Sequence, residues 1–488
     1  MSSRELLDAY LSRMAEIRST GGATNETSYY SALENLLNGV GQQLRPRVIA
    51  NGQIRNQGAG HPDFGLYSQA QCRGGEPAPG AGAIPERGVV EVKGLNEETW
   101  LTAETTQVSQ YWTHYGLVLV SNYRSFLLIG RDSQGHAVRL ESFGLAANDV
   151  EFWNLRHASA EVRDQLAEAL QDYLRRALSY LAPLTRAADL AWLLASYARD
   201  ALRRVEQSAG LPALQTVRAG LEQALGLRFD HAKGEHFFRS TLIQTIFYGI
   251  FSAWVQWART QPAQSTARFD WHAAGWTLHV PMVRTLFEQV ATPSRLGPLG
   301  LVEILNWTGE ALNRVDRASF FEAFDEGRAV QYFYEPFLAH FDPALRKQLG
   351  VWYTPPEIVR YMVERVDLAL REELGIEAGL ASPDVHVLDP CCGTGSFLVE
   401  VMRVIEQRLR DQGEDALLAH DLSTAAPNPP FRLRAHAGTL RNCALADRHD
   451  ARTSRGAARR RSACGRVLDQ RLDGLEHAGR SGRAAPAA

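Results

Sequence analysis

The chain has 488 residues, an apolar fraction of 45% and a formal net charge of -3. This composition is that of a globular protein with about two to four domains, and the charge gives no overall sign of a nucleic-acid partner. Its five cysteines lack the spacing of disulfide frameworks or zinc fingers, which predicts a reducing, cytoplasmic location. The most apolar window, residues 241–258, contains two glutamines and predicts a buried helix rather than a membrane span.

Residues 1–150 are predicted to form a small mixed-sheet α/β domain. Helical spacing covers residues 1–40, where one apolar stripe contains Tyr30, Leu33, Leu36, Leu37 and Val40. Residues 46–66 are strand-like, and residues 68–88 form a loop rich in glycine and proline. The strand VVEVKG, a helix through TTQVSQYWTHY and the strands GLVLVSN and SFLLIGR follow.

The rest of the chain divides into three predicted segments. Residues 151–330 have helical spacing without a chemical motif, as in EVRDQLAEALQDYLRRAL, and are predicted to be a helical connector. Residues 331–425 contain a strand, a glycine-rich turn and a helix, DVHVLDPCCGTGSFLVEVMRVIEQRLR, which is the opening of a parallel α/β sheet. Residues 426–488 form an Arg- and Ala-rich tail, with no aromatic residue in 432–488.

A lysine stands in an apolar strand, although the chain has only three lysines. Because alternate residues of a strand point the same way, Glu91 and Lys93 face one side of VVEVKG. Asp63, in HPDFGLY, ends another strand-like run. Two carboxylates can hold Mg²⁺, and a lysine beside them can neutralise charge on a phosphodiester. The pattern predicts a nuclease site with Asp63 and Glu91 as metal ligands and Lys93 as the catalytic cation.

This pattern, PD followed by ExK, resembles the PD-(D/E)xK nuclease family over residues 20–135. The resemblance implies a further acidic residue on a preceding helix, for which Glu26 and Glu34 are both candidates. It also implies catalytic roles for Gln107 and Tyr111, which match the Q-x3-Y spacing of one branch of the family.

A second string, HVLDPCCGTGSFL, combines an apolar strand, a glycine turn and the start of a helix. Glycines are needed where a ligand approaches the backbone closely, and a helix N-terminus offers unpaired N–H groups to an anion. Ligands of such sheets lie at the carboxyl ends of the strands. The dinucleotide pattern G-x-G-x-x-G is not met, because Leu398 stands three residues after Gly395.

The same string resembles motif I of amino-directed DNA methyltransferases, which bind S-adenosylmethionine (SAM). The resemblance implies that Asp389, Gly393 and Gly395 line the methionine part of SAM and that Phe397 packs below it. Upstream, GVWYTPPEIVRYMV resembles motif X, whose Y-T-P residues are Tyr353, Thr354 and Pro355. Motif X before motif I is the order of the γ class, whose product is N6-methyladenine.

The whole layout resembles single-chain restriction–modification enzymes of the type IIG and type ISP kinds. In these, a PD-(D/E)xK nuclease domain, a helical connector and a Rossmann-like γ-class methyltransferase domain share one polypeptide. The resemblance implies double-stranded DNA as the partner and Mg²⁺ and SAM as cofactors. No G-x4-GK[ST] helicase motif occurs in the chain, which favours the helicase-free arrangement.

The chain departs from this family after motif I. Its string from Asn428 to Phe431, NPPF, resembles the motif that holds a flipped adenine, but it follows Asp389 without the intervening βαβ unit. Codons of FRLRAHAGTLRNCALA and RVLDQRLDGLE read one base later can give FGFELMPAPFVIAHL and VFLTNALTGWN, both typical of the family. We therefore expect a wrong reading frame from about residue 420 onward and no methylation activity.

A single βα unit cannot bury both faces of a sheet, so residues 376–425 are expected to be poorly folded.

Four functions are compatible with the sequence alone: a restriction–modification enzyme, a repair or defence nuclease with a vestigial SAM-binding segment, an RNA or protein methyltransferase, and a non-enzymatic DNA-binding scaffold. The last would fit a surface strand whose Glu91 and Lys93 are only solvated. The valines around them indicate a buried strand instead, where charges need a partner. Loss of Mg²⁺-dependent cutting in Lys93→Ala would separate the nucleases from the scaffold, and SAM stimulation would separate the first function from the second.

Overall fold

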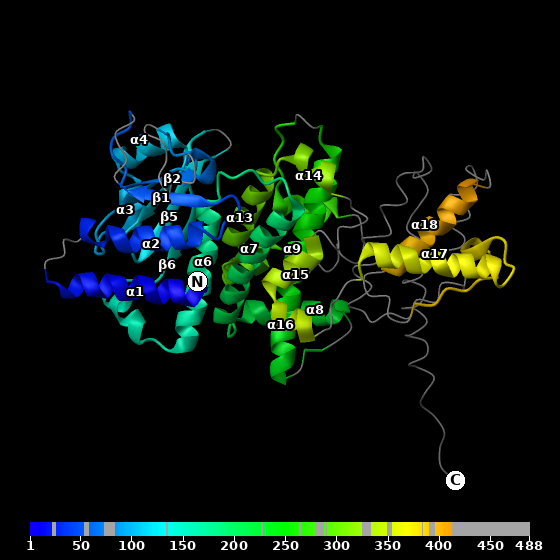
Figure 1. Ribbon diagram of the computed structural model, residues 1–488. Coiled ribbons are helices and arrows are strands. Elements are labelled where there is room, and N and C mark those ends of the chain that lie inside the picture. Colours follow the sequence, from blue (N-terminus) through cyan, green and yellow to red (C-terminus); the bar gives the residue numbers. More distant parts are fainter. Residues whose placement is uncertain are drawn as a thin grey trace, which may run out of the picture. The chain divides into compact units, whose positions relative to one another are not determined.

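A six-stranded mixed sheet is the centre of the first of two units in this computed structural model (Figure 1). The units comprise Met1–Pro183 and Leu184–Ala488. The structure describes residues 1–411 except 22–25, 53–57, 73–82, 133–134, 226–227, 230, 263–264, 279–286, 289, 325–332, 349–353, 383 and 390–395.

The first unit alternates helices and strands. In chain order it contains α1 (Ser3–Ser19), η1 (Thr27–Tyr29), α2 (Tyr30–Gly41), β1 (Val48–Gly52), β2 (Phe64–Ser68), η2 (Gln69–Gln71), β3 (Val89–Val92), α3 (Thr99–Ala103), α4 (Thr106–Tyr115), β4 (Val118–Ser121), β5 (Ser125–Arg131), β6 (Ala137–Gly144), α5 (Asp149–Asn154), η4 (Leu155–His157) and α6 (Ala160–Leu178). The strands lie side by side in sequence order. Neighbouring strands are antiparallel except β3 and β4, whose parallel pairing requires the crossover that α3 and α4 supply.

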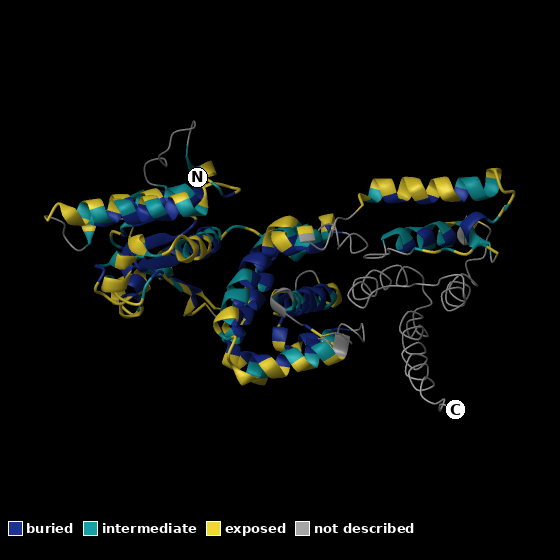
Figure 2. Cartoon of the chain, turned by 90° about the horizontal axis from the view of Figure 1, so that it is seen from below, coloured by how far each residue is buried: buried dark blue, intermediate teal, exposed yellow. Residues whose placement is uncertain are grey.

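Helices cover both faces of this sheet, and its strands are largely buried (Figure 2). Side chains alternate along a strand, so Val90 and Val92 point to one face while Val89 and Glu91 point to the other. The face of Val90 packs against α1, α2 and α6. The face of Val89 packs against Val108 and Tyr111 of α4. Glu91 therefore lies on the side of the sheet that α4 covers.

Three sequence expectations differ from this fold. The strand-like run 46–66 is two strands, β1 and β2, so Asp63 precedes a strand rather than ending one. β6 was not predicted, because its buried residues do not alternate with exposed ones. α6, predicted to open the connector, packs against the sheet in the core of the first unit, which therefore ends at Pro183 and not at residue 150.

The described part of the second unit is helical, as predicted for the connector. Its elements are α7 (Ala187–Gln207), α8 (Pro212–Leu225), α9 (His231–Thr260), η5 (Trp271–Ala273), α10 (Ala274–Thr277), α12 (Pro293–Leu296), η6 (Gly297–Leu299), α13 (Leu301–Asn313), α14 (Arg317–Ala323), α15 (Glu335–Phe341), α16 (Pro343–Gln348), α17 (Pro356–Glu372), η9 (Gly379–Ala381) and α18 (Ser396–Asp411). The apolar window 241–258 lies in α9, and Phe247, Phe251 and Trp254 are buried in the core that α7, α13 and α15 share. No helix in the described ranges has the length and hydropathy needed to cross a membrane.

Helices α17 and α18 share a small apolar core of their own with η9. The predicted helix after the glycine turn is confirmed as α18, but the predicted strand before it is not formed: residues 384–389 pair with no described strand. Leu388 is 65% exposed there. A strand needs neighbouring strands to satisfy its backbone groups, and residues 384–389 have no such neighbour within the described residues.

Candidate functional site

Asp63, directly before β2, lies beside Glu91 of the neighbouring antiparallel strand β3. Phe64 is opposite Val90 in the register of β2 and β3, so the next position brings Asp63 beside Glu91. Asp63 Oδ2 accepts a hydrogen bond from the backbone N–H of Val92 at 2.7 Å. Glu91 is 1% exposed. The structure thus brings together the two carboxylates that the sequence predicted as metal ligands.

Lys93 completes this cluster. Its Nζ donates a hydrogen bond to Glu91 Oε1 at 2.8 Å and lies 3.7 Å from Glu26 Oε1. Glu34, the other candidate for the further acidic residue, instead accepts a hydrogen bond from the backbone N–H of Gly52 at 3.3 Å. Of the two candidates, Glu26 is therefore the one that lies beside Lys93.

Burial dominates the electrostatics of the cluster. Burial and the nearby charge of Asp63 raise the pKa of Glu91 from 4.5 to about 7, against the hydrogen bond from Lys93 that lowers it. Burial also raises the pKa of Asp63, although hydrogen bonds to its carboxylate act in the opposite direction. Burial lowers the pKa of Lys93, but the hydrogen bond to Glu91 and the surrounding carboxylates outweigh that effect and raise it overall. Lys93 is therefore a cation at neutral pH.

One oxygen of Glu91 has no hydrogen-bond partner among the described residues. Its Oε2 is buried and accepts no hydrogen bond from the described residues. A buried carboxylate oxygen without a partner is costly, unless a proton or a cation occupies it. No group of three or more His, Cys, Asp or Glu side chains within the described ranges is arranged to hold a metal. Mg²⁺, however, commonly binds through one or two carboxylates and keeps several waters, so Asp63 and Glu91 fit this ion.

Gln107 and Tyr111 meet on α4, beside this cluster. Gln107 Nε2 donates a hydrogen bond to the Tyr111 hydroxyl at 2.8 Å. The Tyr111 ring packs against the turn before Asp63, where a Cβ on Gly60 would lie 3.3 Å from the ring. Burial raises the pKa of Tyr111, and the negative charges of Asp63 and Glu91 raise it further. All five residues predicted for the nuclease site thus lie in one region of the first unit.

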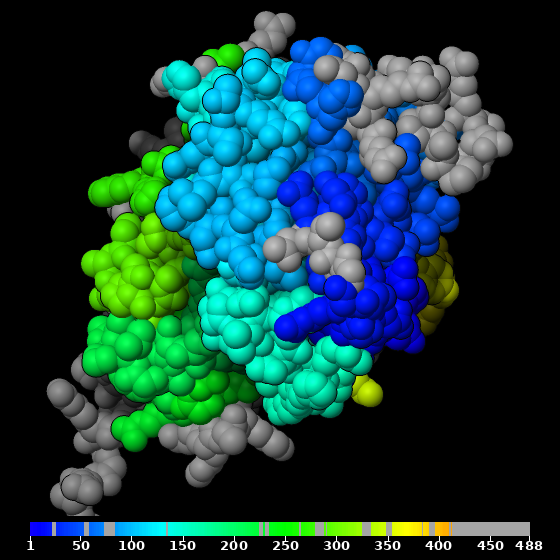
Figure 3. Space-filling view, turned by 90° about the vertical axis from the view of Figure 1, so that its left-hand side faces the viewer, coloured from blue at the N-terminus to red at the C-terminus, as the bar shows by residue number. Residues whose placement is uncertain are grey.

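The sequence did not predict two tyrosines that contact this region. Tyr30 donates a hydrogen bond to Asp63 Oδ1, and Tyr123 donates one to the backbone carbonyl of Glu26. Tyr123 is fully buried and has a left-handed φ of 70°, a conformation unusual for a tyrosine. The face seen in Figure 3 shows the dark-blue N-terminal residues bordering the lighter-blue residues that follow β3. The need of Tyr30 for a hydrogen-bond partner could have been found from sequence, because it lies on an apolar stripe and a buried tyrosine hydroxyl usually needs such a partner.

Helices α17 and α18 of the second unit run parallel. Arg360 of α17 lies 3.8 Å from Glu400 of α18, and further along both helices Arg408 pairs with Asp367. The two contacts advance in the same direction along both helices, so their N-terminal ends lie on the same side of the pair. The residues directly before these ends belong to the two segments that are predicted from sequence to bind SAM.

The predicted SAM-binding residues are only partly described. Thr354 and Pro355 are exposed directly before α17, Asp389 is half-buried, and Phe397 packs against the small core of α17 and α18. Four further predicted features lie outside the described residues: Tyr353, Gly393, Gly395 and the string from Asn428 to Phe431.

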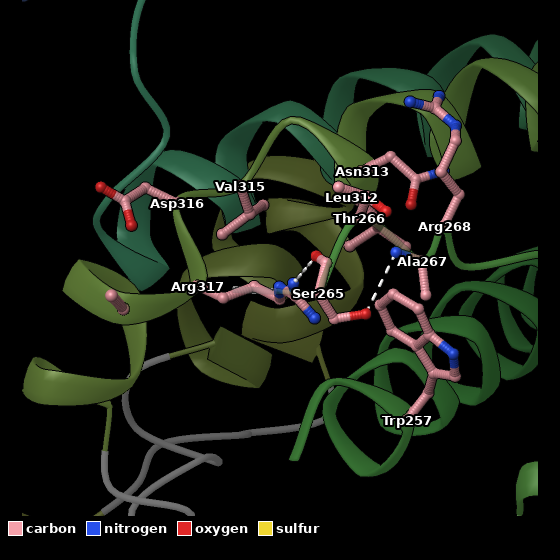
Figure 4. A pocket seen from close by; sticks show the side chains of 11 residues that line it. Trp257, Ser265, Thr266, Ala267, Arg268, Leu312, Asn313, Val315, Asp316 and Arg317 are labelled. Atoms are coloured by element: carbon pink, nitrogen blue, oxygen red, sulfur yellow. Dashed lines mark hydrogen bonds between the residues drawn. The ribbon is translucent and has the colours of Figure 1, made fainter. Parts of the chain in front are cut away.

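A pocket of about 310 Å³ lies elsewhere in the second unit, between the end of α9 and α14 (Figure 4). Several of its polar side chains have partners. Arg317 donates to the Ser265 carbonyl at 2.5 Å, Arg268 pairs with Glu310, and Asn313 bonds the backbone of the residue after Arg268. None of the residues predicted for catalysis lines this pocket.

Comparison with known proteins assigns part of the chain to a family. A search of curated proteins finds no match. Two solved structures are similar: a cryo-EM structure of a DrdV–DNA complex (19% identity, TM-score 0.31, covering 84% of this chain and 36% of that chain) and the ATP-dependent type ISP restriction-modification enzyme LlaBIII bound to DNA (16% identity, TM-score 0.33, covering 64% and 21%). The chain thus spans well under half of either protein. Residues 328–426, called the methylase segment below, match the family model described as N-6 DNA Methylase.

Proposed function

We propose that the chain is the nuclease-bearing part of a restriction–modification enzyme. Its first unit cleaves double-stranded DNA with Mg²⁺, and its methylase segment belongs to a domain that transfers a methyl group from SAM to N6 of adenine. The observation that carries the nuclease proposal is the cluster of buried Glu91 with half-buried Asp63 and Lys93, in which Glu91 Oε2 lacks a hydrogen-bond partner among the described residues.

Each residue of the cluster has a role that its surroundings support. Mg²⁺, when bound, polarises the phosphate and activates the attacking water. Asp63 and Glu91 would hold the ion, since the pairing of β2 with β3 brings the two residues side by side. Lys93 stays charged and compact, and so can neutralise the charge that develops on the scissile phosphate. Gln107 would act through the hydroxyl of Tyr111, to which it is bonded.

The methylase segment supports a SAM site at the N-terminal side of the helix pair α17 and α18. Helix N-termini favour anionic groups, so the carboxylate of SAM would suit this position. Asp389, Phe397, Thr354 and Pro355 are the described residues that would line it. The family match ends at residue 426, before Asn428, which supports the view that NPPF is not the catalytic motif. We infer that the chain with this sequence does not methylate DNA.

The nuclease proposal is tested by cleavage of unmethylated linear double-stranded DNA by the full chain, with Mg²⁺ or with EDTA. We expect Mg²⁺-dependent cleavage that falls by about 10²–10³-fold in Lys93→Ala, because one positioned charge contributes that much to such reactions. Lys347→Ala is the matched control, since it removes another of the three lysines from an exposed position on α16. Equal cleavage by both variants would contradict the proposal.

A repair or defence nuclease with a vestigial SAM-binding segment is the second candidate. The observation that favours it is segment 384–389, which forms no strand with the described residues. SAM added to the cleavage reaction distinguishes the two candidates. Stimulation of cutting by SAM, together with loss of SAM binding in Asp389→Ala, supports the restriction–modification enzyme, and cutting that is indifferent to SAM supports the second candidate.

A further inference from the structure

Tyr30 is the first residue of α2 and reaches the candidate metal site from outside the sheet. Its ring packs against Phe64, with 5.2 Å between the ring centroids. Its hydroxyl donates a hydrogen bond to Asp63 Oδ1. The ring is thus held by the first residue of β2, while the hydroxyl is directed at the carboxylate that precedes this strand.

Both oxygens of the Asp63 carboxylate have a donor. Tyr30 binds Oδ1, and the backbone N–H of Val92 binds Oδ2 at 2.7 Å. The two donors come from different elements, α2 and β3, so together they fix the plane of the carboxylate. A carboxylate oxygen has two lone pairs, so each Asp63 oxygen still has one to offer to a cation.

Glu91 is held differently. Lys93 binds its Oε1 at 2.8 Å, and its Oε2 accepts no hydrogen bond from the described part of the chain. The site therefore combines one carboxylate that is fixed at both oxygens with one that is fixed at a single oxygen. For both carboxylates to bind the same ion, Asp63 must keep its orientation while Glu91 presents Oε2, the oxygen without a hydrogen-bond partner among the described residues.

We propose that Tyr30 is a positioning residue of this site, whose hydroxyl holds the Asp63 carboxylate in the orientation that binds Mg²⁺ together with Glu91. This inference rests on the nuclease function proposed above. Groups that orient metal ligands from outside typically contribute about 10–100-fold to metal affinity. Tyr30 does not touch the ion or the DNA in this role and acts only through Asp63.

The test uses the full chain with Tyr30→Phe, which removes the hydroxyl and keeps the ring against Phe64. We expect the dissociation constant for Mg²⁺, measured by calorimetry without DNA, to rise about 10–100-fold. The Mg²⁺ concentration that gives half-maximal cleavage should rise by the same factor, while the cleavage rate at saturating Mg²⁺ returns close to that of the unaltered chain. A purely structural role would instead lower the thermal unfolding temperature and leave the metal affinity of the folded fraction unchanged.

Tyr29→Phe is the matched control, because it removes a tyrosine hydroxyl one residue away, in η1, where the ring packs against Tyr123 and Trp153. It should leave Mg²⁺ binding unchanged. A double-mutant cycle gives a second measurement: Tyr30→Phe should have no further effect on Mg²⁺ affinity in a chain that already carries Asp63→Asn.

The outcomes separate this inference from the function on which it rests. Suppose that the single variant Glu91→Gln abolishes Mg²⁺ binding but the single variant Tyr30→Phe leaves the Mg²⁺ affinity unchanged. This result overturns the role of Tyr30 and leaves the nuclease proposal intact. An additive effect of Tyr30→Phe on Asp63→Asn also overturns it. If the unaltered chain shows no Mg²⁺ binding that depends on Glu91, the metal site itself is wrong, and the inference fails with it.

Discussion

Glu91 determines the pH range in which the proposed metal site of the first unit would take up a cation. Its pKa is raised to about 7 by burial and by the neighbouring charge of Asp63. Ionisation of Glu91 therefore destabilises the folded chain: the stability of the neutral form is fully present below pH 4.5 and is lost as the pH rises through about 7. A bound cation restores this stability only where Glu91 is ionised.

We expect Mg²⁺ to raise the thermal unfolding temperature of the chain at pH 8 and to have almost no effect at pH 5.5. The reason is that the ion competes with the proton on Glu91, so its apparent affinity falls by about tenfold for each pH unit below the pKa of this residue. Thermal scans with and without Mg²⁺ at both pH values measure this difference. Glu91→Gln should remove the Mg²⁺ effect at pH 8, and an equal Mg²⁺ effect at both pH values in the unaltered chain would refute the argument.

The proximity of Asp63, Glu91 and Lys93 could be predicted from sequence, whereas the residues that contact them could not. Asp63, Glu91 and Lys93 could be predicted because the two-residue repeat of a strand fixes which side chains share a face. Tyr30 could not, because its bond to Asp63 joins residues 33 positions apart, and periodicity alone placed it with the apolar stripe. Glu26 and Glu34 could not be separated for the same reason. Only the folded chain shows that Tyr123 holds the backbone of Glu26 beside Lys93.

At the scale of elements, the least predictable part of the first unit is the contact between β6 and α6. Glu141 of β6 is 4% exposed and accepts a hydrogen bond from Arg176 Nε of α6 at 2.8 Å. A buried glutamate interrupts the alternation of apolar and polar residues by which strands are recognised. A buried arginine is read as exposed, so the helix that contains it is assigned to the connector rather than to the core of the first unit. This ion pair joins β6, which was not predicted, to α6, whose helical spacing was predicted but whose place in the first unit was not.

Arg176→Ala should destabilise the first unit by about 3–5 kcal/mol, because it leaves the Glu141 carboxylate buried without its arginine. Urea unfolding of the full chain, followed by the fluorescence of its tryptophans, measures the loss. Arg156→Ala is the control, since Arg156 is exposed in η4 and its removal should change stability by less than about 0.5 kcal/mol. A loss in Arg176→Ala as small as that of the control would show that the buried pair contributes little.

At the scale of the molecule, the first unit has both of its hydrophobic clusters within its own residues. Every member of the two clusters that sandwich the sheet lies between Leu6 and Tyr180. We therefore expect a fragment of residues 1–183 to fold alone, to unfold in one cooperative transition and to bind Mg²⁺ as the full chain does. Circular dichroism during heating, and calorimetry with Mg²⁺, test this. A fragment ending at residue 150, the boundary predicted from sequence, should not fold, because it lacks α6.

The methylase segment differs from the first unit, because it contains a strand-like sequence without the neighbouring strands of a sheet among the described residues. Segment 384–389 carries the apolar residues of a strand, yet no described strand pairs with it, and Leu388 stays exposed. The family match stops at residue 426, close to the point from which we propose that the chain is read in the wrong frame. In a sheet, the strands that follow in sequence would supply the missing neighbours for this segment.

Sequencing the gene from codon 405 onward tests this proposal directly. We expect codons that, read one base later, encode FGFELMPAPFVIAHL and VFLTNALTGWN in a single frame. A chain expressed in that frame should gain strand content by circular dichroism and bind SAM, and Asp389→Ala should abolish the binding, because a paired strand would then hold this carboxylate at the end of a sheet. If the codons are incompatible with both strings, the tail from residue 426 is genuine, and the unpaired segment 384–389 requires another partner.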